Sequence, residues 1–282
     1  MGTISQTTSH AEEVSTRQRF EFGRNWARFL QTLNDERIAQ AEQSLRNMLG
    51  RDLAGLTFLD AGSGSGLFSL AARRMGARVH SFDYDPNSVN CTKELRRRYF
   101  DGDANWSVET ASVLDNSYLS KFGQFDIVYS WGVLHHTGQM WDALANVAPL
   151  VKEGGQLWIA IYNDQGTPSR RWTTVKKLYN QCPPALRFLV LGPAFVHLWW
   201  RRLLKDALTL QPLRSFREYK ELRGMSLWHD VVDWVGGYPF EVAKPEEIFD
   251  FYRDRGFQLE RLRTEGGSLG CNEFLLRRRT EQ

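Results

Sequence analysis

The sequence predicts an α/β fold built on a doubly wound, mainly parallel sheet. A short apolar run is followed by glycines at three alternate positions, Gly62, Gly64 and Gly66. A chain that turns sharply from a strand into a helix beside a ligand needs residues without a Cβ at the turn. A second short strand, 77–83, ends in Asp83 about 20 residues after the glycines, as nucleotide-binding sheets of this kind do.

Composition indicates how large the core can be and which cellular compartment the protein occupies. The chain has 282 residues, of which 42% are hydrophobic and 24% charged, enough for one large core with an elaboration. Its three cysteines are widely separated, which indicates neither a disulfide framework nor a zinc site and favours a reducing cytoplasm. Residues 1–15 are polar, without the features of a secretory signal, and are expected to be a disordered lead.

Charge argues against a nucleic-acid substrate. The net charge is only +3, and the arginine runs 96–98 and 277–279 are expected on a solvated helix face and at a frayed strand end. Nucleic-acid binding needs a basic stripe with aromatic stacking partners, which these runs do not make. We therefore expect a small-molecule partner; oligomeric state is not predicted by any pattern.

The glycine motif distinguishes between two classes of nucleotide-binding sheet. The pattern Asp60-x-Gly62-x-Gly64-x-Gly66 differs from the G-x-G-x-x-G fingerprint of nicotinamide dehydrogenases. It resembles the first motif of the class I S-adenosylmethionine-dependent methyltransferases, in which the turn accommodates the amino-acid part of the cofactor. The resemblance covers about residues 55–162 in order. It implies a Rossmann-like seven-stranded doubly wound sheet with an antiparallel last strand, S-adenosyl-L-methionine as cofactor, and cofactor contacts from Asp60, Gly62, Ser63, Gly64 and Gly66.

Asp83 and its neighbours match the second motif. The carboxylate at the tip of the second strand is suited to both ribose hydroxyls, and we include Tyr84 beside it among the cofactor-binding residues. Pro86 suits the first turn of the next helix. The alternative, in which Asp85 binds the ribose and Asp83 is only a cap, stays open.

The third and fourth strands complete the expected cofactor site. Residues 106–110 alternate as a strand, and the following loop is expected beside the adenine. Family members often carry an Asp there, whereas this chain has Ala111-Ser112, so the candidates are Ser112 and the amide of Val113. The fourth strand opens with Asp126, and by resemblance it ends above the sulfonium. Its last residues, expected to bind the cofactor, are Ser130 and Trp131.

The C-terminal part is expected to complete the sheet. Residues 244–256 form a helix-like stretch with Pro near its start and Gly at its end. Strands are predicted at 257–263 and 272–277, and the resemblance places the last strand antiparallel between strands five and six. The glycine-rich loop before it ends in Asn272, a candidate substrate contact.

The predicted organisation has five parts: the lead 1–15, an N-terminal helical cap 16–50, the cofactor-binding core 51–162, a helical lid insertion 163–243, and the C-terminal completion 244–282. A connection as long as the insertion is normally functional. Within it we expect helices at 168–181, 184–209 and 213–223. In the cap, Trp26 is a candidate to shield the sulfonium and Arg24 is a candidate to contact a carboxylate. Plain packing of an amphipathic helix is at least as strongly expected for Phe29 and Leu30.

One apolar run in the insertion has two interpretations. Residues 186–204 are too short to cross a bilayer and are interrupted by Gly192-Pro193. They are expected either to pack as lid helices on the core or to make an interfacial membrane contact or a groove for a lipid-like acceptor.

These observations predict a methyltransferase acting on a small molecule, with oxygen as the expected acceptor atom, nitrogen as the next, and a glycan- or lipid-like compound as acceptor. Transfer to a hydroxyl needs a base. The candidate bases are His136, His229 and His135, with Asp230 to orient an imidazole.

A polar island in the insertion supplies the candidate substrate contacts Trp228, Asp233 and Tyr238. His229, Asp230 and Asp233 also suggest a metal, but without a further ligand none is expected. The alternative is a catalytically silent member that binds the cofactor or a partner protein.

Overall fold

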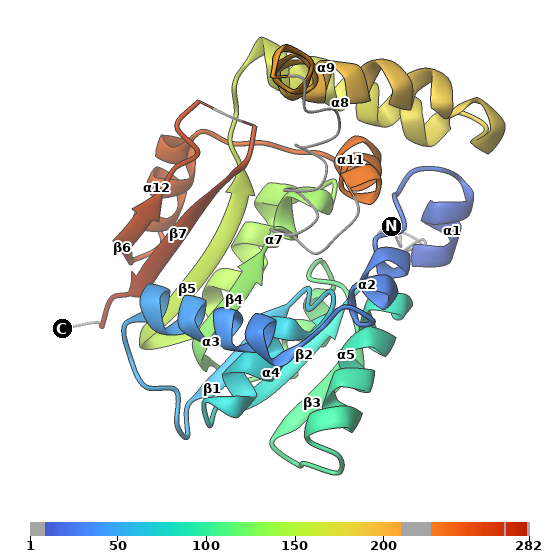
Figure 1. The fold of residues 1–282 in the computed structure, drawn as a ribbon. Helices are drawn as coiled ribbons and strands as arrows, with labels where there is room; N and C mark the ends of the chain where they lie inside the picture. Colours follow the sequence, from blue (N-terminus) through green and yellow to red (C-terminus); the bar gives the residue numbers. More distant parts are fainter. Residues whose placement is uncertain (1–8, 210–226, 268, 281–282) are drawn as a thin grey trace, which may run out of the picture. The chain divides into compact units, whose positions relative to one another are not determined.

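The computed structural model describes residues 9–209, 227–267 and 269–280 (Figure 1). They form two compact units. We call Phe22–Ser169 with Phe240–Gln282 the core unit, and Met1–Glu21 with Arg170–Pro239 the insertion unit. The long connection expected at 163–243 therefore belongs largely to a unit of its own, together with the N-terminal segment.

The core unit contains one seven-stranded sheet in the order β3-β2-β1-β4-β5-β7-β6. Only β7 runs antiparallel to its neighbours, which are β5 and β6. The predicted Rossmann-like sheet with an antiparallel last strand is confirmed. The strands are β1 (Thr57–Ala61), β2 (Arg78–Asp83), β3 (Trp106–Thr110), β4 (Phe125–Trp131), β5 (Val151–Tyr162), β6 (Phe257–Arg263) and β7 (Cys271–Arg278).

Helices cover both faces of this sheet. One apolar cluster joins the strands to α3 (Asp35–Leu49), α4 (Leu67–Arg74) and α5 (Pro86–Tyr99). A second cluster, on the other face, includes α6 (Asn116–Leu119), α7 (Met140–Val147) and α12 (Pro245–Arg253). In α3 the buried residues recur at helical spacing, as Ile38, Ala41, Leu45 and Met48. Both faces of the sheet are thereby buried, and its free ends are left to form the site.

The insertion unit is helical. The helices among its described residues are α1 (His10–Ser15), α8 (Thr167–Gln181, which starts in the core unit), η3 (Pro184–Leu186), α9 (Phe188–Leu208) and α11 (Leu227–Gly236). The ammonium group of the buried Lys176 on α8 donates to the Trp234 carbonyl of α11, and it lies 4.1 Å from the centroid of the Trp234 ring. The Asn180 amide donates to the Gly236 carbonyl over 2.6 Å. These bonds fasten α8 to α11.

The insertion unit differs from the expected organisation at its N-terminal segment. Residues 10–15, expected within a disordered lead, form α1, because Ser9 and Glu12 make a reciprocal capping box. The helix expected at 213–223 lies outside the described residues. No helix in the described ranges is long and apolar enough to span a membrane.

The end of the sheet opposite the glycine loop is held by Asp126, at the start of β4. Its carboxylate accepts from the Thr57 hydroxyl (2.7 Å) and backbone N–H (2.8 Å) of β1, and from the Lys152 ammonium (2.9 Å) of β5. Burial alone would raise the pKa of Asp126, but these bonds lower it from 3.8 to about 2. Asp126 therefore joins three strands through its ionised form.

We expect Asp126→Asn to lower the free energy of unfolding at neutral pH by about 1–2 kcal/mol, since Lys152 is partly exposed and its ion pair is screened. A carboxyl group with a depressed pKa stabilises the fold above its unfolded pKa of 3.8, and this contribution disappears as the pH falls through about 2. Urea unfolding at several pH values should show the two proteins converging in acid. The exposed Asp101→Asn is the control; an equal loss at acid and neutral pH would contradict the assignment.

Candidate active site

The site is built where the carboxyl ends of parallel strands meet. β1 pairs with β2 and β4, so the loops that follow these three strands lie at one edge of the sheet. Gly62 has φ +90°, and a Cβ there would lie 2.4 Å from the Val133 side chain. Gly66 has φ +79° at the N-cap of α4, and a Cβ there would lie 2.8 Å from the Thr92 Cα. The glycine loop thus needs glycine both for its turn and for its close packing.

Asp60 is a buried carboxylate immediately before this loop. One carboxylate oxygen accepts from the Ser69 hydroxyl over 2.5 Å, and Ser69 bonds in turn to Ser81 over 2.7 Å. The other oxygen, Oδ1, has no hydrogen-bond partner among the described residues. Burial raises the pKa of Asp60 to about 7. A buried acceptor with this spare capacity is suited to a cationic group of a ligand.

Asp83 faces the glycine loop from the end of β2. Its Oδ2 accepts from the Gly64 N–H over 2.8 Å and its Oδ1 from the Asp85 N–H over 2.9 Å. Asp85 is committed elsewhere: its carboxylate accepts from the N–H groups of Asn87 and Gly23, both over 2.8 Å, and it caps α5. Asp83 is therefore the carboxylate placed at the loop, and its contact with a ribose stays a prediction.

Trp26 covers part of the same loop. It belongs to α2 (Gly23–Phe29), and a Cβ on Gly64 would lie 3.2 Å from its indole ring. The half-buried Tyr84 follows Asp83. The Arg24 side chain lies outside the described part of the chain. The side chain expected to shield the sulfonium is thus adjacent to the predicted cofactor loop, and its contact with a cofactor stays a prediction.

The hydroxyl groups among the cofactor candidates are engaged within the fold. Ser63 bonds to Thr92 over 2.9 Å, and the fully buried Ser130 donates to the Ala61 carbonyl over 2.7 Å. The Ser112 hydroxyl accepts from the Leu114 N–H over 3.1 Å within the turn after β3. These serines therefore shape the edge of the site.

Two further candidates at this edge differ in exposure. Val113 is buried, and its carbonyl accepts from the Asn146 side chain over 3.0 Å. Trp131, at the end of β4, keeps 44% of its surface exposed. Trp131 is thus the accessible side chain of the pair.

Two histidines follow β4 in the short helix η1 (Leu134–His136). His135 is buried, and its ring centroid lies 4.1 Å from that of Tyr162 at the end of β5. His136 is half-buried, with ring centroids 5.0 Å from Phe22 and 5.5 Å from Tyr162. Aromatic walls therefore hold the His136 imidazole at the site's edge, where it retains access to solvent.

Sequence reasoning missed the residues that support this pair. Tyr162 also contacts Phe240, with centroids 4.9 Å apart. The Glu241 N–H donates to the His135 carbonyl over 3.0 Å, and its carboxylate accepts from the Met140 N–H over 3.0 Å at the start of α7. Burial raises the pKa of Glu241. Tyr162 could have been predicted as a site residue, because it is the last residue of a strand that ends at the expected edge of the sheet. No sequence pattern around Glu241 indicates a role in the site.

The candidate substrate contacts fall in both units. In the core unit the buried Asn272 donates to the Asn163 side chain and accepts from the Glu265 N–H, each over 3.1 Å, which joins β7 to the end of β5. These bonds leave one amide hydrogen for a ligand. Asp233 and Tyr238 belong to the insertion unit. The side chains of Trp228, His229 and Asp230 lie outside the described residues.

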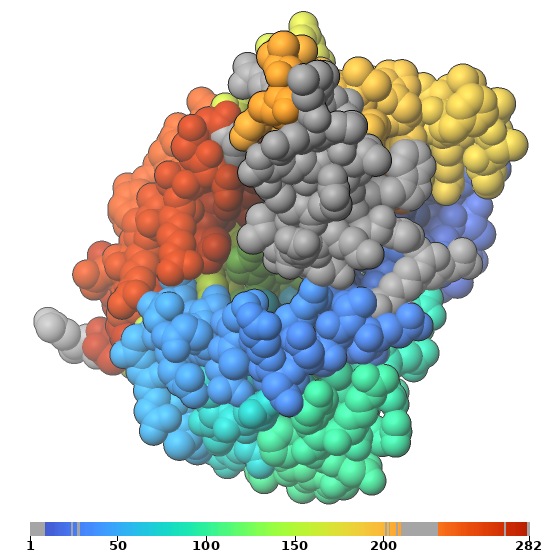
Figure 2. Space-filling view, in the orientation of Figure 1, coloured from blue at the N-terminus to red at the C-terminus, as the bar shows by residue number. Residues whose placement is uncertain are grey.

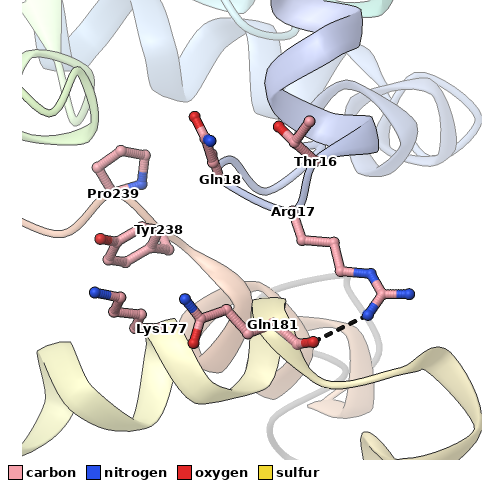
Figure 3. A pocket seen from close by; sticks show the side chains of 7 residues that line it. All are labelled: Thr16, Arg17, Gln18, Lys177, Gln181, Tyr238 and Pro239. Carbon is pink, nitrogen blue, oxygen red and sulfur yellow. Dashed lines mark hydrogen bonds between the residues drawn. The ribbon is translucent and has the colours of Figure 1, made fainter.

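Tyr238 lines a polar cavity of about 470 Å³ within the insertion unit (Figure 3). The other lining residues are Thr16, Arg17, Gln18, Lys177, Gln181 and Pro239. The Arg17 guanidinium points away from the cavity and donates to the Gln181 carbonyl over 3.0 Å. The described residues contain no group of His, Cys, Asp or Glu that could hold a metal ion.

Comparison with known proteins agrees with this geometry. Residues 59–157 match the family described as a methyltransferase domain. The ubiquinone biosynthesis O-methyltransferase of Methylobacterium sp. is 28% identical over 142 residues, covering 48% of this chain and 55% of that protein. The protein of that name from Methylocella silvestris is 30% identical over 172 residues, covering 60% and 62%. This chain therefore spans less than two thirds of these relatives.

A solved structure shows the same fold. The magnesium protoporphyrin IX methyltransferase from Synechocystis, with bound S-adenosylhomocysteine, superposes with a TM-score of 0.50 at 16% identity, covering 85% of this chain and 82% of that one. The part of the chain that carries the glycine loop and Asp83 is thus similar to a methyltransferase domain, and the seven-stranded sheet matches the fold of a solved methyltransferase.

Proposed function

We propose that this protein transfers a methyl group from S-adenosylmethionine to a hydroxyl oxygen of a small molecule. The observation that carries the proposal is the position of His136, a half-buried imidazole that follows β4 at the same sheet edge as the glycine loop. An imidazole accepts a proton near neutral pH, which a hydroxyl acceptor must lose during transfer. The names of the relatives, O-methyltransferases in ubiquinone biosynthesis, support oxygen as the acceptor atom.

The residues at the loop fit the cofactor. The spare oxygen of Asp60 suits the ammonium of its amino-acid part, and Asp83 beside Gly64 suits the ribose hydroxyls. Trp26 suits a covering role over the loop. When bound, S-adenosylmethionine supplies a methyl group on a sulfonium that leaves as a neutral thioether. The protein's contribution is to position the reactants and exclude water.

His136 has the role of general base in this proposal. Phe22 and Tyr162 limit the rotation of its ring, and the acceptor's proton passes to the imidazole as the new carbon–oxygen bond forms. His135 is too buried for direct contact, and it positions the segment through its carbonyl bond to Glu241.

The cofactor assignment predicts that Asp83→Ala weakens binding of both S-adenosylmethionine and S-adenosylhomocysteine. Loss of hydrogen bonds to a charged acceptor costs about 1.5–3 kcal/mol, roughly 10- to 150-fold in the dissociation constant. Calorimetry measures this directly. Asp103→Ala is the control, because Asp103, like Asp83, accepts from a backbone N–H, but it precedes β3 at the other end of the sheet. Unchanged affinity in a folded Asp83 variant would overturn the ribose assignment.

The raised pKa of Asp60 predicts that the affinity for S-adenosylmethionine depends on pH. With a pKa of about 7 the free carboxyl is largely protonated at about pH 6, and an ammonium ligand favours the ionised form. Affinity for S-adenosylmethionine should therefore rise several-fold from about pH 6 to pH 7.5 with release of a proton. Calorimetry in buffers of different ionisation enthalpy detects that proton. Asp60→Asn should remove the pH dependence; a wild-type affinity that is flat over this range would contradict the contact.

The acceptor atom and the base can be tested together. Methyl-labelled cofactor is supplied with 3,4-dihydroxybenzoate or with the matched 3,4-diaminobenzoate, and labelled product is measured. We expect the dihydroxy compound to be preferred, and His136→Ala to lower its turnover by roughly 100-fold at unchanged cofactor affinity.

His229→Ala, made in parallel, tests the competing base from the insertion. A loss of only a few-fold in both histidine variants would leave positioning as the mechanism. Preference for the diamine would indicate nitrogen as the acceptor atom. Cofactor binding without transfer to any probe would favour a catalytically silent protein.

A further inference from the structure

Helix α9 presents an exposed apolar face. The exposed fractions are 57% for Leu189, 56% for Val196, 48% for Trp200, 50% for Leu204 and 75% for Leu208. These residues are separated by seven, four, four and four positions, so their side chains lie along one side of the helix. Figure 2 shows the yellow-to-orange atoms of α8 and α9 at the surface of the molecule.

This face is separate from the one that packs in the insertion unit. Leu191, Ala194 and Trp199 of the same helix are 4%, 7% and 6% exposed and belong to its buried side. Monomeric proteins rarely leave a large contiguous apolar surface in water without a binding role. A row of exposed apolar side chains such as this one is typical of a binding surface.

The surrounding charge indicates which occupant. From Thr167 to Leu208 the sequence holds eight lysines and arginines, of which Lys176 is buried, and a single acidic residue, Asp206. Asp206 is 5% exposed, whereas Arg202 and Lys205 are exposed. The whole chain has a net charge of only +3, so positive charge is concentrated on α8 and α9. An apolar face combined with basic side chains matches the interface of an anionic lipid bilayer.

We propose that α9 lies on an anionic lipid bilayer, with its exposed face among the acyl chains and its basic side chains at the headgroups. Long basic side chains can rest on apolar surface while their charges reach phosphate oxygens. The proposal does not depend on the identity of the methyl acceptor.

The test uses the full chain and large vesicles of phosphatidylcholine, alone or mixed equally with phosphatidylglycerol. We expect co-sedimentation with the mixed vesicles only, weakened at high salt because headgroup contacts are screened. The triple variant Leu189→Ser/Trp200→Ser/Leu204→Ser should lower the partition coefficient at least about tenfold, since each substitution removes apolar area from the interface. Arg202→Gln/Lys205→Gln should reduce the preference for anionic vesicles.

Matched variants separate this effect from general loss of structure. Phe249→Ser/Leu262→Ser replaces apolar side chains of the core unit that are 36% and 42% exposed, and it should bind vesicles like wild type. Trp200→Phe keeps an apolar ring and should also bind. Thermal unfolding of each variant verifies the fold.

Three results would overturn the proposal. The first is an absence of vesicle binding by the wild type. The second is equal loss of binding in the core-unit control. The third is a wild-type dimer, seen by sedimentation equilibrium, that the triple variant dissociates while vesicle binding is absent.

Discussion

The tie between the glycine loop and the end of β2 is the constraint on which the site depends. The N–H groups of Gly62 and Ser63 both donate to the Phe82 carbonyl, and the Gly64 N–H donates to the Asp83 carboxylate. A turn this tight between β1 and α4 leaves no room for a Cβ at Gly62. Because the loop is fixed to β2, Asp60, Asp83 and Trp26 are held around the same short segment. The proposed cofactor site is therefore largely formed by the fold itself.

The two ends of the sheet use carboxylates in opposite ways. At the amino end, Asp126 is ionised and saturated by donors from β1 and β5, so it contributes to stability. At the carboxyl end, Asp60 is buried with an oxygen that has no partner in the described part of the chain, and burial raises its pKa. Full satisfaction suits a structural role, whereas unused capacity in a buried site suits ligand binding. The number of hydrogen-bond donors around each aspartate thus distinguishes a carboxylate suited to stability from one suited to ligand binding.

The insertion unit has a different physical character from the core unit. Its helices pack on one another through buried aromatic residues and through Lys176 and Asn180, which bond to backbone carbonyls of α11. It also carries most of the chain's excess of basic residues and the exposed apolar face of α9. The core unit's surface lacks a comparable row of exposed apolar residues on any described helix.

The sequence by itself determined the glycine loop and the carboxylate that follows β2, because these depend on local turn chemistry and on spacing along the chain. The antiparallel last strand between strands five and six followed from the resemblance to the family. It also identified His136 by its place after β4. Only the tertiary structure decided that Asp85 caps α5 while Asp83 meets Gly64, and that Ser130 is used to join β4 to β1. It alone brought Phe22, Tyr162 and Glu241 to the histidine pair. The reason is physical: these contacts join residues as much as 114 positions apart, and their partners are chosen by packing of whole elements, which no local pattern encodes.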